Sequence, residues 1–542
     1  MPSETIDYSP LKLLHGAALR HPGRKSLIWV REKTSVENLR ESETWSVSES
    51  FARVVALARA FRDWGVAAGD RVAVIGKNSP WHLVAFAAGS AIPAITVPIN
   101  WQLPQAELAE TLAHCSPKVI LVDETNRAKF ESALARASAG STILVTFAEL
   151  ASLTSPEVLA RSVSSDPLAL AIAASRGLGP IPVCGDSTAG AIIYTSGTAA
   201  RPKGTLLTYK NLWWGCLNFR EAFEYSPDCV EAVAAPLSHI GGFNGTTTDL
   251  FTNGGTVVVF EKFEPRLLLA AIEAFGIQMM FGVPTMFRLL ADVAEASAFD
   301  TSSFTRALVG GAAWDRELAR RVVELGWGPI NIWGMTEQSA SGACLTTDVM
   351  AGREVGVGRS FPHIELRVSG LDGEPVPAGA IGQVECRGPS VTREYFRDPE
   401  LTAAAIDPET GWFQTGDLGL LDEDGFLRLM GRLTDTINSG GEKIFAVKVA
   451  SVLAAHPQVA EVQVLGIPDP LWGEVVGAVV VPRGFLTLAD LQDFGRSTLA
   501  PYELPRRLAL VDAIPLNANG KPDRESLRAL FETHDASREF SD

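Results

Sequence analysis

Short apolar runs alternate with amphipathic stretches over residues 45–180. The stretches 48–64 and 80–91 carry apolar residues at helical spacing, whereas 71–75 and 118–122 are strand-like, each with four consecutive apolar residues after a basic one. Strands and helices that alternate in this way are typical of a parallel sheet whose strands are joined by crossover helices. The pattern therefore predicts an α/β unit in this part of the chain.

A second series of the same kind follows. Residues 256–260, 278–281 and 306–309 are predicted strands, and residues 267–275 are a predicted helix. The third strand ends before a pair of glycines, Gly310 and Gly311. Two α/β units packed side by side are therefore expected.

The segments shorten, and glycine and proline become more frequent, between residues 356 and 430. This change predicts a β-rich, barrel-like third unit. The main boundary is expected at 432–435, so that a large N-terminal α/β domain spans 1–431, with two α/β subdomains and a distorted β-barrel, and a small α+β domain spans 432–542. The elements expected in the small domain are helices at 447–455 and 488–499 and strands at 462–465 and 475–481.

Two regions could be mistaken for other kinds of structure. The most apolar one, residues 83–99, is interrupted by Ser90, Pro93 and Pro98, so we expect a helix and a buried strand rather than a membrane span. The Ala/Ser-rich residues 150–182 are expected to be a loose surface connection. The N-terminus has no basic segment followed by an apolar one, so no signal peptide is predicted.

Composition and charge narrow the function classes. A chain of 542 residues is too long for one core, and at least two domains are expected. The net charge of -16 argues against binding to nucleic acids or to anionic membranes, because either partner requires a basic face on the protein. The six cysteines are scattered without a CxxC pair, so neither a zinc site nor a disulfide framework is predicted. A cytoplasmic location fits best.

The most informative segment is a loop, Tyr194–Gly204, that follows a buried-strand pattern. It has the residue types that wrap polyphosphate, namely hydroxyl donors, a glycine that allows close backbone approach, and a compact cation. A Walker P-loop is excluded, because that motif needs Gly-Lys-Ser/Thr at the start of a helix. A plain surface turn is the structural alternative. The residues concerned are Thr195, Ser196, Gly197, Thr198 and Lys203.

Four more blocks follow the loop in order, and together they identify a family. They are Trp333–Glu337, Trp412–Asp417, Gly431–Arg432 and Asn519–Arg524. With the loop, they make the chain resemble the adenylate-forming superfamily, which contains acyl- and aryl-CoA synthetases, adenylation domains of peptide synthetases, and luciferases. The resemblance covers residues 45–530. It implies an enzyme that activates a carboxylic acid with ATP and releases pyrophosphate.

The resemblance also implies roles for individual residues. The loop and Lys203 would hold the β and γ phosphates, Thr336 the α phosphate, and Glu337 a Mg²⁺ ion. Lys521 would stabilise charge in the adenylating state, and the small domain would rotate about a hinge at 432–435. The alternative for Glu337 is an exposed carboxylate in the first turn of a helix. The residues expected around adenine and ribose are Gly311, Ala312, Asn331, Trp333, Gly334, Met335, Asp417 and Arg432.

Two further sites are carried over from the family. An acid pocket would begin at His239, although a core histidine is an alternative for this residue. Its mixture of aromatic, small and polar groups favours an aromatic or medium-sized acid. The other expected pocket residues are Phe243, Asn244, Phe281, Val283, Gly310 and Ile332. A coenzyme A tunnel would run past Gly440, Gly441 and Trp472, with core packing as the alternative for the tryptophan.

Several positions depart from the family pattern. Ala199-Ala200 replaces Thr-Gly in the loop, Thr434 occupies the hinge position of an Asp or Lys, and Lys448 reverses the charge of a glutamate. These changes put the transfer step in doubt more than adenylation. The alternative is an adenylating enzyme of secondary metabolism with another acceptor: a carrier-protein thiol, an amine, or an aryl amine diazotised by activated nitrite. A non-catalytic nucleotide-binding protein is a third reading. A homodimer is a further candidate assembly.

Overall fold

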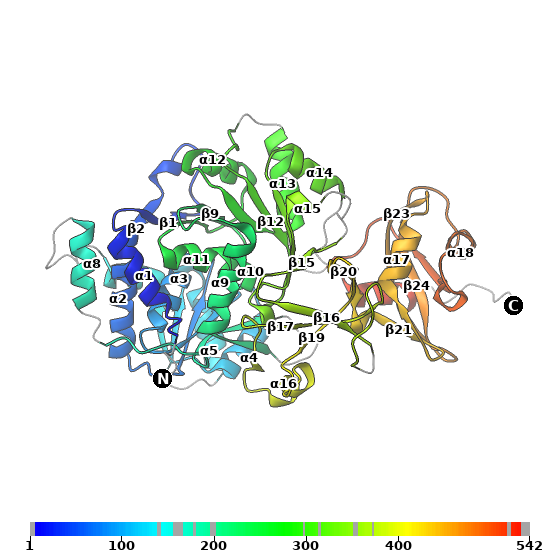
Figure 1. The fold of residues 1–542 in the computed structure, drawn as a ribbon, viewed down its shortest axis with the longest axis horizontal. Helices are drawn as coiled ribbons and strands as arrows, with labels where there is room; N and C mark the ends of the chain where they lie inside the picture. The colour runs from blue at the N-terminus through cyan, green and yellow to red at the C-terminus, as the bar shows by residue number, and fades with distance from the viewer. Residues whose placement is uncertain are drawn as a thin grey trace. The chain divides into compact units, whose positions relative to one another are not determined.

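The computed structural model of the chain contains two compact units, which are described separately here (Figure 1). The first consists of Met1–Leu366 and Cys386–Phe413, and the second of Arg367–Glu385 and Gln414–Asp542. The residues that the structure describes are 6–137, 142–155, 166–176, 180–195, 202–295, 299–312, 316–350, 356–370, 373–516 and 522–532.

The larger sheet in the described part of the first unit has nine strands, in the order β15-β14-β13-β12-β11-β9-β10-β1-β2. The six strands from β13 to β1 are parallel, whereas β14, β15 and β2 pair antiparallel at the two edges. The strands are β1 (Lys25–Val30), β2 (Glu43–Ser46), β9 (Val230–Val233), β10 (Thr256–Phe260), β11 (Met279–Gly282), β12 (Arg306–Gly310), β13 (Pro329–Trp333), β14 (Ala343–Leu345) and β15 (Arg359–Ser360).

A second sheet in the described part of this unit has seven strands, in the order β18-β8-β7-β4-β3-β5-β6. The strands from β7 to β6 are parallel, and β8 and β18 add an antiparallel edge. The strands are β3 (Arg71–Ile75), β4 (Ile95–Ile99), β5 (Val119–Val122), β6 (Ile143–Thr146), β7 (Ala189–Thr195), β8 (Lys203–Thr208) and β18 (Glu394–Tyr395).

A layer of helices lies between the two sheets. α3 (Trp81–Gly89) and α9 (Tyr209–Phe223) pack on the seven-stranded sheet, α11 (Thr246–Asn253) packs on the nine-stranded sheet, and α11 contacts both other helices (Figure 1). In this layer Phe86 packs against Tyr209 and Phe243, with ring centroids 5.5 and 5.2 Å apart. Each fully buried aromatic side chain of this kind stabilises the fold by about 1.5–3 kcal/mol.

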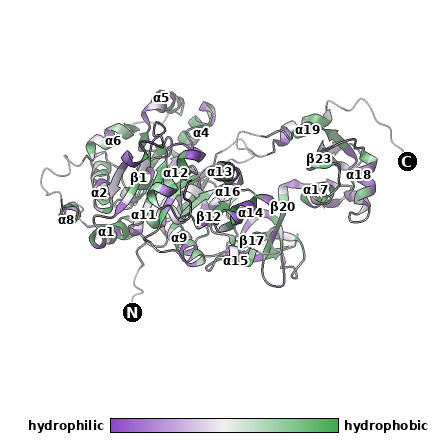
Figure 2. Cartoon of the chain, turned by 90° about the horizontal axis from the view of Figure 1, so that it is seen from above, coloured by the Kyte–Doolittle hydropathy of each residue, from purple (hydrophilic) through white to green (hydrophobic). Residues whose placement is uncertain are grey.

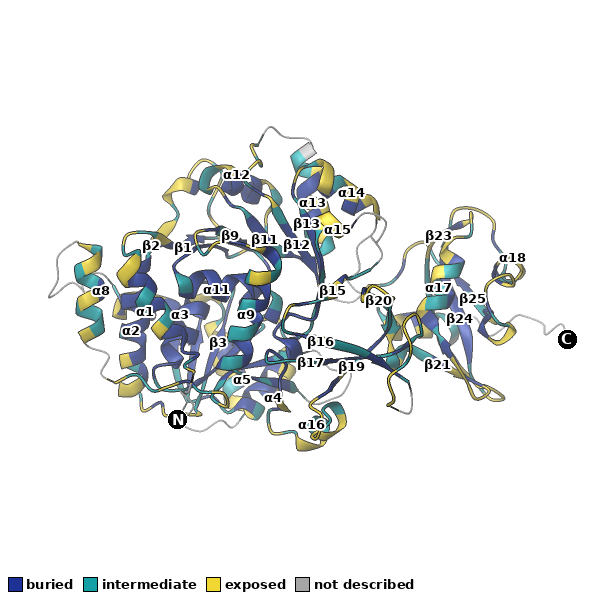
Figure 3. Cartoon of the chain, in the orientation of Figure 1, coloured by how far each residue is buried: buried dark blue, intermediate teal, exposed yellow. Residues whose placement is uncertain are grey.

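Other helices lie outside this layer, and each turns one side to the core and an exposed side to solvent (Figure 3). α14 mixes hydrophilic and hydrophobic residues along its length, and Leu318, Ala319 and Val322 are its buried face (Figure 2). α2 and α9 begin with capping boxes, in which Ser46 and Thr208 satisfy free backbone N–H groups. The remaining helices of the unit are α1 (Pro10–Arg20), α2 (Val47–Asp63), α4 (Gln105–Cys115), α5 (Arg127–Arg136), α6 (Phe147–Leu153), α8 (Pro167–Arg176), α10 (Ile240–Phe243), α12 (Pro265–Phe275), α13 (Pro284–Glu295), α14 (Arg316–Glu324), α15 (Thr347–Met350) and α16 (Pro399–Ala405).

The C-terminal part of the chain is β-rich and then α+β. A four-stranded sheet in the order β16-β17-β19-β20 comes first, and β22-β21-β24-β23 with β25 beside β24 form a second sheet. α17 packs on β23, and its Val449 shares a buried core with Ile437 of β21 and Val476 of β24. The elements are β16 (Glu365–Ser369), β17 (Gly382–Arg387), β19 (Phe413–Leu421), β20 (Leu427–Arg432), β21 (Thr436–Ser439), β22 (Glu442–Phe445), α17 (Ala446–Ala454), β23 (Val459–Asp469), β24 (Gly473–Pro482), α18 (Leu488–Gly495), β25 (Arg507–Leu510) and α19 (Arg524–Glu532).

The structure confirms the predicted fold class of two α/β units, a β-rich segment and an α+β end. The expectation of a loose connection at 150–182 is wrong for 150–153, which belongs to α6, and for 167–176, which forms α8. α8 packs on α1 and α2, with Ala171 fully buried, because its small residues allow close helix packing. Domain boundaries at 432–435 stay a prediction, and the chain there forms a short 3-10 turn, Leu433–Asp435. No helix among the described residues is long and apolar enough to cross a membrane.

Candidate active site

The predicted phosphate loop is closed by a β-hairpin. β7 and β8 pair antiparallel, and the last pair of the ladder joins Thr195 to Lys203. A side chain at Gly204 would lie 2.9 Å from Ile192, so the stem needs a small residue there. Of the residues predicted in this loop, Thr195 and Lys203 are described, whereas Ser196, Gly197 and Thr198, with the departures Ala199 and Ala200, lie outside the described residues. The hairpin therefore fixes the positions of Thr195 and Lys203, the two residues that flank the rest of the loop.

Lys203 meets Glu337 at this stem. The Lys203 Nζ lies 2.9 Å from the Glu337 Oε1, and the hydroxyl of Tyr395 donates a hydrogen bond of 2.8 Å to the same oxygen. Glu337 lies on a 3-10 turn, Thr336–Gln338, and is only 5% exposed. The alternative of an exposed surface carboxylate is therefore excluded. A buried carboxylate needs such partners, because an unpaired buried charge is costly.

The turn that carries Thr336 and Glu337 is held in an unusual backbone conformation. Ser339 and Ala340 follow it with φ of 53° and 71°, in the left-handed region that residues other than glycine seldom adopt. A Cβ at Gly334 would lie 2.1 Å from the Ala340 carbonyl oxygen, so only glycine fits there. The Ser339 hydroxyl donates to the Ser390 carbonyl at 2.9 Å. The surrounding contacts thus fix the position of Thr336 and Glu337.

The residues predicted for adenine lie at the carboxyl ends of β12 and β13. Gly310 pairs with Ile332, so Gly311 and Trp333 come one residue beyond this pair on adjacent strands. Gly311 has a φ of 79°, and both it and Ala312 are exposed. Ligands of open α/β sheets bind at such carboxyl ends.

Asn331 lies beside this edge, on β13. Its side-chain amide donates to the Gly356 carbonyl at 2.9 Å, and the residue is buried. Met335 follows Gly334 and is partly buried against the core. This arrangement fixes the Asn331 amide plane and uses its N–H side, so the amide oxygen is the group that could accept a hydrogen bond from a ligand.

Most of the predicted acid-pocket residues also gather at this edge of the sheet. Phe281, at the end of β11, fits between two glycines: a Cβ at Gly241 would lie 2.5 Å from its ring, and one at Gly310 would lie 3.0 Å from it. Val283 comes within 3.4 Å of the Cβ position of Gly311. His239 is exposed at the N-terminus of α10, so it is not a core histidine.

Phe243 and Asn244 lie deeper than the other predicted pocket residues. Phe243 is fully buried against Phe86. The Asn244 amide donates to the carbonyls of Leu212 and Ser339, at 3.2 and 3.4 Å, and accepts from the Cys216 thiol at 3.4 Å. Asn244 therefore bridges α9 and the turn after Glu337, and its role toward the acid stays a prediction.

In the second unit Asp417 and Arg432 form an ion pair. They face each other in the register of β19 and β20, and the Arg432 Nε lies 2.7 Å from the Asp417 Oδ1. The Asp417 side chain is 8% exposed and that of Arg432 is 55% exposed. The backbone N–H of Asp417 donates to the Thr415 hydroxyl at 3.0 Å. Asp417 is thus a fixed, buried acceptor and not a free turn aspartate.

The predicted coenzyme A residues are brought together in this unit. The Gly440 N–H donates to the Trp472 carbonyl at 2.8 Å, and a Cβ at Gly440 would lie 2.5 Å from the Trp472 ring. Gly441 has a φ of 91° and no atom within 4 Å of its Cβ position. Trp472 is 38% exposed, so it is not a core residue, and the Arg506 guanidinium lies 4.6 Å from its ring centroid.

The departures in the second unit have local partners. The Thr434 hydroxyl donates to the Asp435 carboxylate at 3.0 Å. Lys448, on α17, forms an ion pair with Glu503. Glu503 is buried, and a buried carboxylate without a cationic partner would destabilise the fold. Lys521 lies outside the described residues.

Comparison with known proteins identifies the family. The model of the AMP-binding enzyme family matches residues 14–396, and that of the AMP-binding enzyme C-terminal domain matches residues 448–521. The chain belongs to the AMP-binding enzyme family. This confirms the resemblance to adenylate-forming enzymes that the motifs indicated.

Relatives in the AMP-binding family match almost the whole chain. A feruloyl-CoA synthase of Amycolatopsis sp is 34% identical over 488 residues, which are 89% of this chain and 93% of that protein. An indoleacetate–CoA ligase of Aromatoleum aromaticum is 34% identical over 477 residues, 88% of this chain and 91% of the relative. The solved structure of the amide bond synthetase McbA from Marinactinospora thermotolerans has a TM-score of 0.80 at 26% identity, covering 97% of this chain and 99% of that one.

Sequence reasoning missed Tyr395 and Arg506. Tyr395 touches both Lys203 and Glu337, and Arg506 stacks on Trp472. Neither residue belongs to a recognised motif block. Their positions follow from β18 pairing with β8 and from the turn before β25, which the hydrophobic pattern does not reveal.

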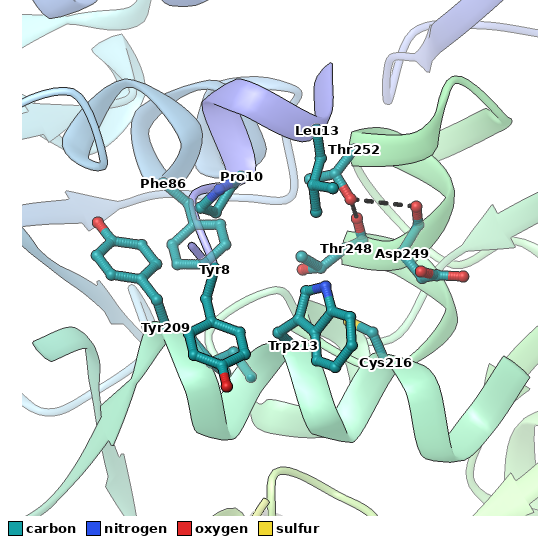
Figure 4. Close-up of a pocket in the computed structure, with 11 residues that line it drawn as sticks. Tyr8, Pro10, Leu13, Phe86, Tyr209, Trp213, Cys216, Thr248, Asp249 and Thr252 are labelled. Atoms are coloured by element: carbon teal, nitrogen blue, oxygen red, sulfur yellow. Dashed lines mark hydrogen bonds between the residues drawn. The ribbon is translucent and has the colours of Figure 1, made fainter. Parts of the chain in front are cut away.

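A small cavity elsewhere in the first unit is too small for an acid. It has a volume of about 20 Å³ and lies between the N-terminal segment and the helices α9 and α11 (Figure 4). Such a volume holds about one water molecule. Its lining includes Tyr8, Phe86 and Trp213 and none of the predicted site residues. The cavity is therefore a packing defect of the helical layer and not the acid pocket.

Proposed function

We propose that the chain is an AMP-forming acid–thiol ligase. It activates an aromatic or medium-sized carboxylic acid with ATP, releases pyrophosphate, and transfers the acyl group to coenzyme A. The observation that carries this proposal is the contact between Lys203, at the stem of the phosphate loop, and the buried Glu337. A cation held beside a buried carboxylate supports the binding of a triphosphate together with its metal ion.

The chemistry is nucleotidyl transfer, in which positioning and charge neutralisation dominate. The acid carboxylate attacks the α phosphorus of ATP, an acyl–AMP bond forms, and pyrophosphate leaves. In the proposed roles, Thr195 and Lys203 bind the outer phosphates with the loop, and Thr336 contacts the α phosphate. Asp417 accepts from the ribose hydroxyls, Arg432 holds it in place, and Lys521 neutralises the developing charge.

The metal ion in this proposal is Mg²⁺ at Glu337. The residues fit such an ion, because Mg²⁺ is usually held by one or two carboxylates together with the phosphates of its substrate. Among the described residues there is no cluster of three or more acidic, histidine or cysteine ligands. A single buried carboxylate beside the phosphate loop is what a metal that arrives with ATP requires. When bound, the ion would neutralise phosphate charge.

The acid class rests on the shape of the β11–β12 edge and on the relatives. The ring of Phe281 between Gly241 and Gly310 offers an apolar wall for a flat substrate, with the exposed His239 beside it. The two relatives are named for feruloyl and indoleacetate groups, which are both aromatic. These observations favour an aromatic acid.

Coenzyme A is the proposed acceptor. The Trp472 ring packs on Gly440, Gly441 beside it has open space at its Cβ position, and Arg506 adds a positive charge next to that ring. The two relatives are named as CoA ligases. The second candidate is an amine acceptor, because a structure with a TM-score of 0.80 is that of an amide bond synthetase. A carrier-protein thiol and activated nitrite are the remaining acceptors to test.

Further features belong to the same proposal. The small domain rotates about 432–435 between the two half-reactions, and the enzyme works in the cytoplasm, in keeping with six free cysteines. A homodimer and a role in secondary metabolism are also proposed and await a direct test.

The deciding experiment incubates the protein with ATP, Mg²⁺ and a panel of aryl and acyl acids, and reads the products by mass spectrometry. Pyrophosphate and an acyl-adenylate are expected for at least one aromatic acid, followed by AMP and a thioester when coenzyme A is added. Formation of ADP would contradict adenylation. Turnover only with an amine, a carrier protein, or nitrite plus an aminoaryl acid would select the corresponding alternative acceptor.

A further inference from the structure

Tyr395 is fixed between the two halves of the phosphate site. β18 pairs antiparallel with β8, and in this register Tyr395 faces Thr205, two residues beyond Lys203. The Tyr395 N–H donates to the Thr402 hydroxyl at 2.9 Å, and the residue is buried. Its backbone is therefore as rigid as the stem of the loop.

The same segment also holds the turn that carries Glu337. The Thr392 N–H donates to the Glu337 carbonyl at 2.7 Å, and the Thr392 hydroxyl donates to the Leu206 carbonyl at 2.6 Å. Residues 392–395 thus connect the backbone of β8 with that of Glu337. The distance between Lys203 and Glu337 is set by this connection.

The Tyr395 side chain acts on both partners. Its hydroxyl donates to the Glu337 Oε1 at 2.8 Å, and the Lys203 Nζ lies 4.5 Å from its ring centroid. A phenol is a hydrogen-bond donor, so Tyr395 can hold the Glu337 carboxylate oxygen through its hydroxyl.

The two contacts use only one of the two oxygens of the Glu337 carboxylate. Tyr395 and Lys203 both approach Oε1, and among the described residues no hydrogen bond reaches the other oxygen, Oε2. When Lys203 turns to a phosphate, the Tyr395 hydroxyl still holds Oε1. One oxygen then stays oriented by the protein, and the other is available to a ligand.

We propose that Tyr395 is a positioning residue, whose hydroxyl orients the Glu337 carboxylate so that one oxygen is presented to the divalent cation that accompanies ATP. This inference rests on the proposed function, because it concerns the metal–nucleotide complex. It adds a residue outside the motif blocks to the site. It also explains why a tyrosine hydroxyl is buried against an acidic side chain.

The test compares nucleotide binding with and without the metal. Isothermal titration calorimetry measures the affinity for the ATP analogue AMPCPP in Mg²⁺ and in EDTA, for wild type and for Tyr395→Phe, which keeps the ring beneath Lys203. A hydrogen bond to a charged group implies that the variant binds the Mg²⁺ complex about tenfold or more weakly. Affinity in EDTA should change by less than about twofold, because the phosphate contacts of Lys203 remain.

Tyr209→Phe is the matched control. This substitution also removes a buried hydroxyl, which donates to the Ala94 carbonyl at 3.0 Å. Tyr209, however, lies in the helical layer and not at the Glu337 site. The control variant should bind both forms of the analogue like wild type. An equal loss in Mg²⁺ and in EDTA for Tyr395→Phe would show a merely structural role, and unchanged Mg²⁺ binding would overturn the inference. A wild-type protein that binds the analogue in neither condition would instead overturn the proposed function, and this role with it.

Discussion

Lys448 and Glu503 form a two-pronged ion pair, in which the Lys448 Nζ lies 2.7 Å from both oxygens of the Glu503 carboxylate. Glu503 is buried, and its carboxylate also accepts the Ala500 N–H at 2.9 Å. The reversed charge at Lys448 is therefore satisfied inside the second unit. It has a structural explanation that does not require a changed transfer reaction.

Reversing this lysine should destabilise the second unit. Lys448→Glu places two carboxylates together and leaves Glu503 buried without its cation, which we expect to cost about 2–4 kcal/mol in the free energy of unfolding. The double variant Lys448→Glu/Glu503→Lys should recover most of this loss, because the pair is re-formed with opposite polarity. Urea unfolding of wild type and both variants measures these changes in the free energy of unfolding. Equal stability of the single and double variants would show that the ion pair is not what holds these residues.

Removing the cation at the loop stem should impair adenylation. Lys203→Gln keeps a donor for Glu337 but loses the charge, so acid-dependent pyrophosphate exchange should fall about 100-fold. The matched control is Lys210→Gln, which removes a half-buried lysine in the first turn of α9 that pairs with Asp186. The exchange rate of this control should stay within twofold of wild type. Normal exchange by Lys203→Gln would remove Lys203 from phosphate binding.

A methyl group beside Phe281 should disturb the acid and not the nucleotide. The Cβ of Gly241→Ala would lie 2.5 Å from the Phe281 ring, so the ring must move. We expect KM for the acid to rise about tenfold while KM for ATP is unchanged, as measured by steady-state kinetics. Gly23→Ala is the control, since its Cβ would meet no atom closer than 4.0 Å. Parallel increases in both KM values would place Phe281 outside the acid pocket.

A buried carboxyl group in the large sheet makes stability depend on pH. Burial raises the pKa of Glu231, on β9, from 4.5 to about 8. The unfolded chain therefore loses this proton at a lower pH than the folded chain, and stability falls as pH rises from about 4.5 to about 8. The slope approaches one proton, about 1.4 kcal/mol per pH unit.

Glu231→Gln should remove this slope. Unfolding free energies measured in urea at several pH values between 5 and 8 should change less for this variant than for wild type. Glu107→Gln, an exposed substitution on α4, should keep the wild-type pH dependence. A variant as pH-dependent as wild type would show that Glu231 does not hold a proton in the folded protein.

The central elements of the fold could be predicted because their sequences are locally consistent. The runs at Arg71–Ile75 and Thr256–Phe260, which are apolar after their first residue, are β3 and β10 with the predicted bounds, since strands buried on both faces consist mostly of apolar residues. The hydrophobic pattern did not reveal the edge strands β18 and β15. Each has only two residues, so its pairing depends on the rest of the sheet.

The residues of the candidate site were likewise predictable only in part. Lys203, Glu337 and Asp417 belong to motif blocks, which a sequence reveals because the chemistry needs their residue types at fixed spacing. Tyr395 lies 58 positions from Glu337, and only the pairing of β18 with β8 brings the two side chains together. Phe243 shows the opposite case, because a residue carried over from the family as part of the acid pocket packs into the core.

The most direct test of the central claim is acid-dependent exchange of labelled pyrophosphate into ATP, measured without coenzyme A across a panel of aromatic acids. Lys521→Ala, with a circular dichroism spectrum like that of wild type, serves as the matched blank. We predict exchange by wild type with at least one acid and none by the variant. Absence of exchange with every acid, or equal exchange by Lys521→Ala, would contradict the account.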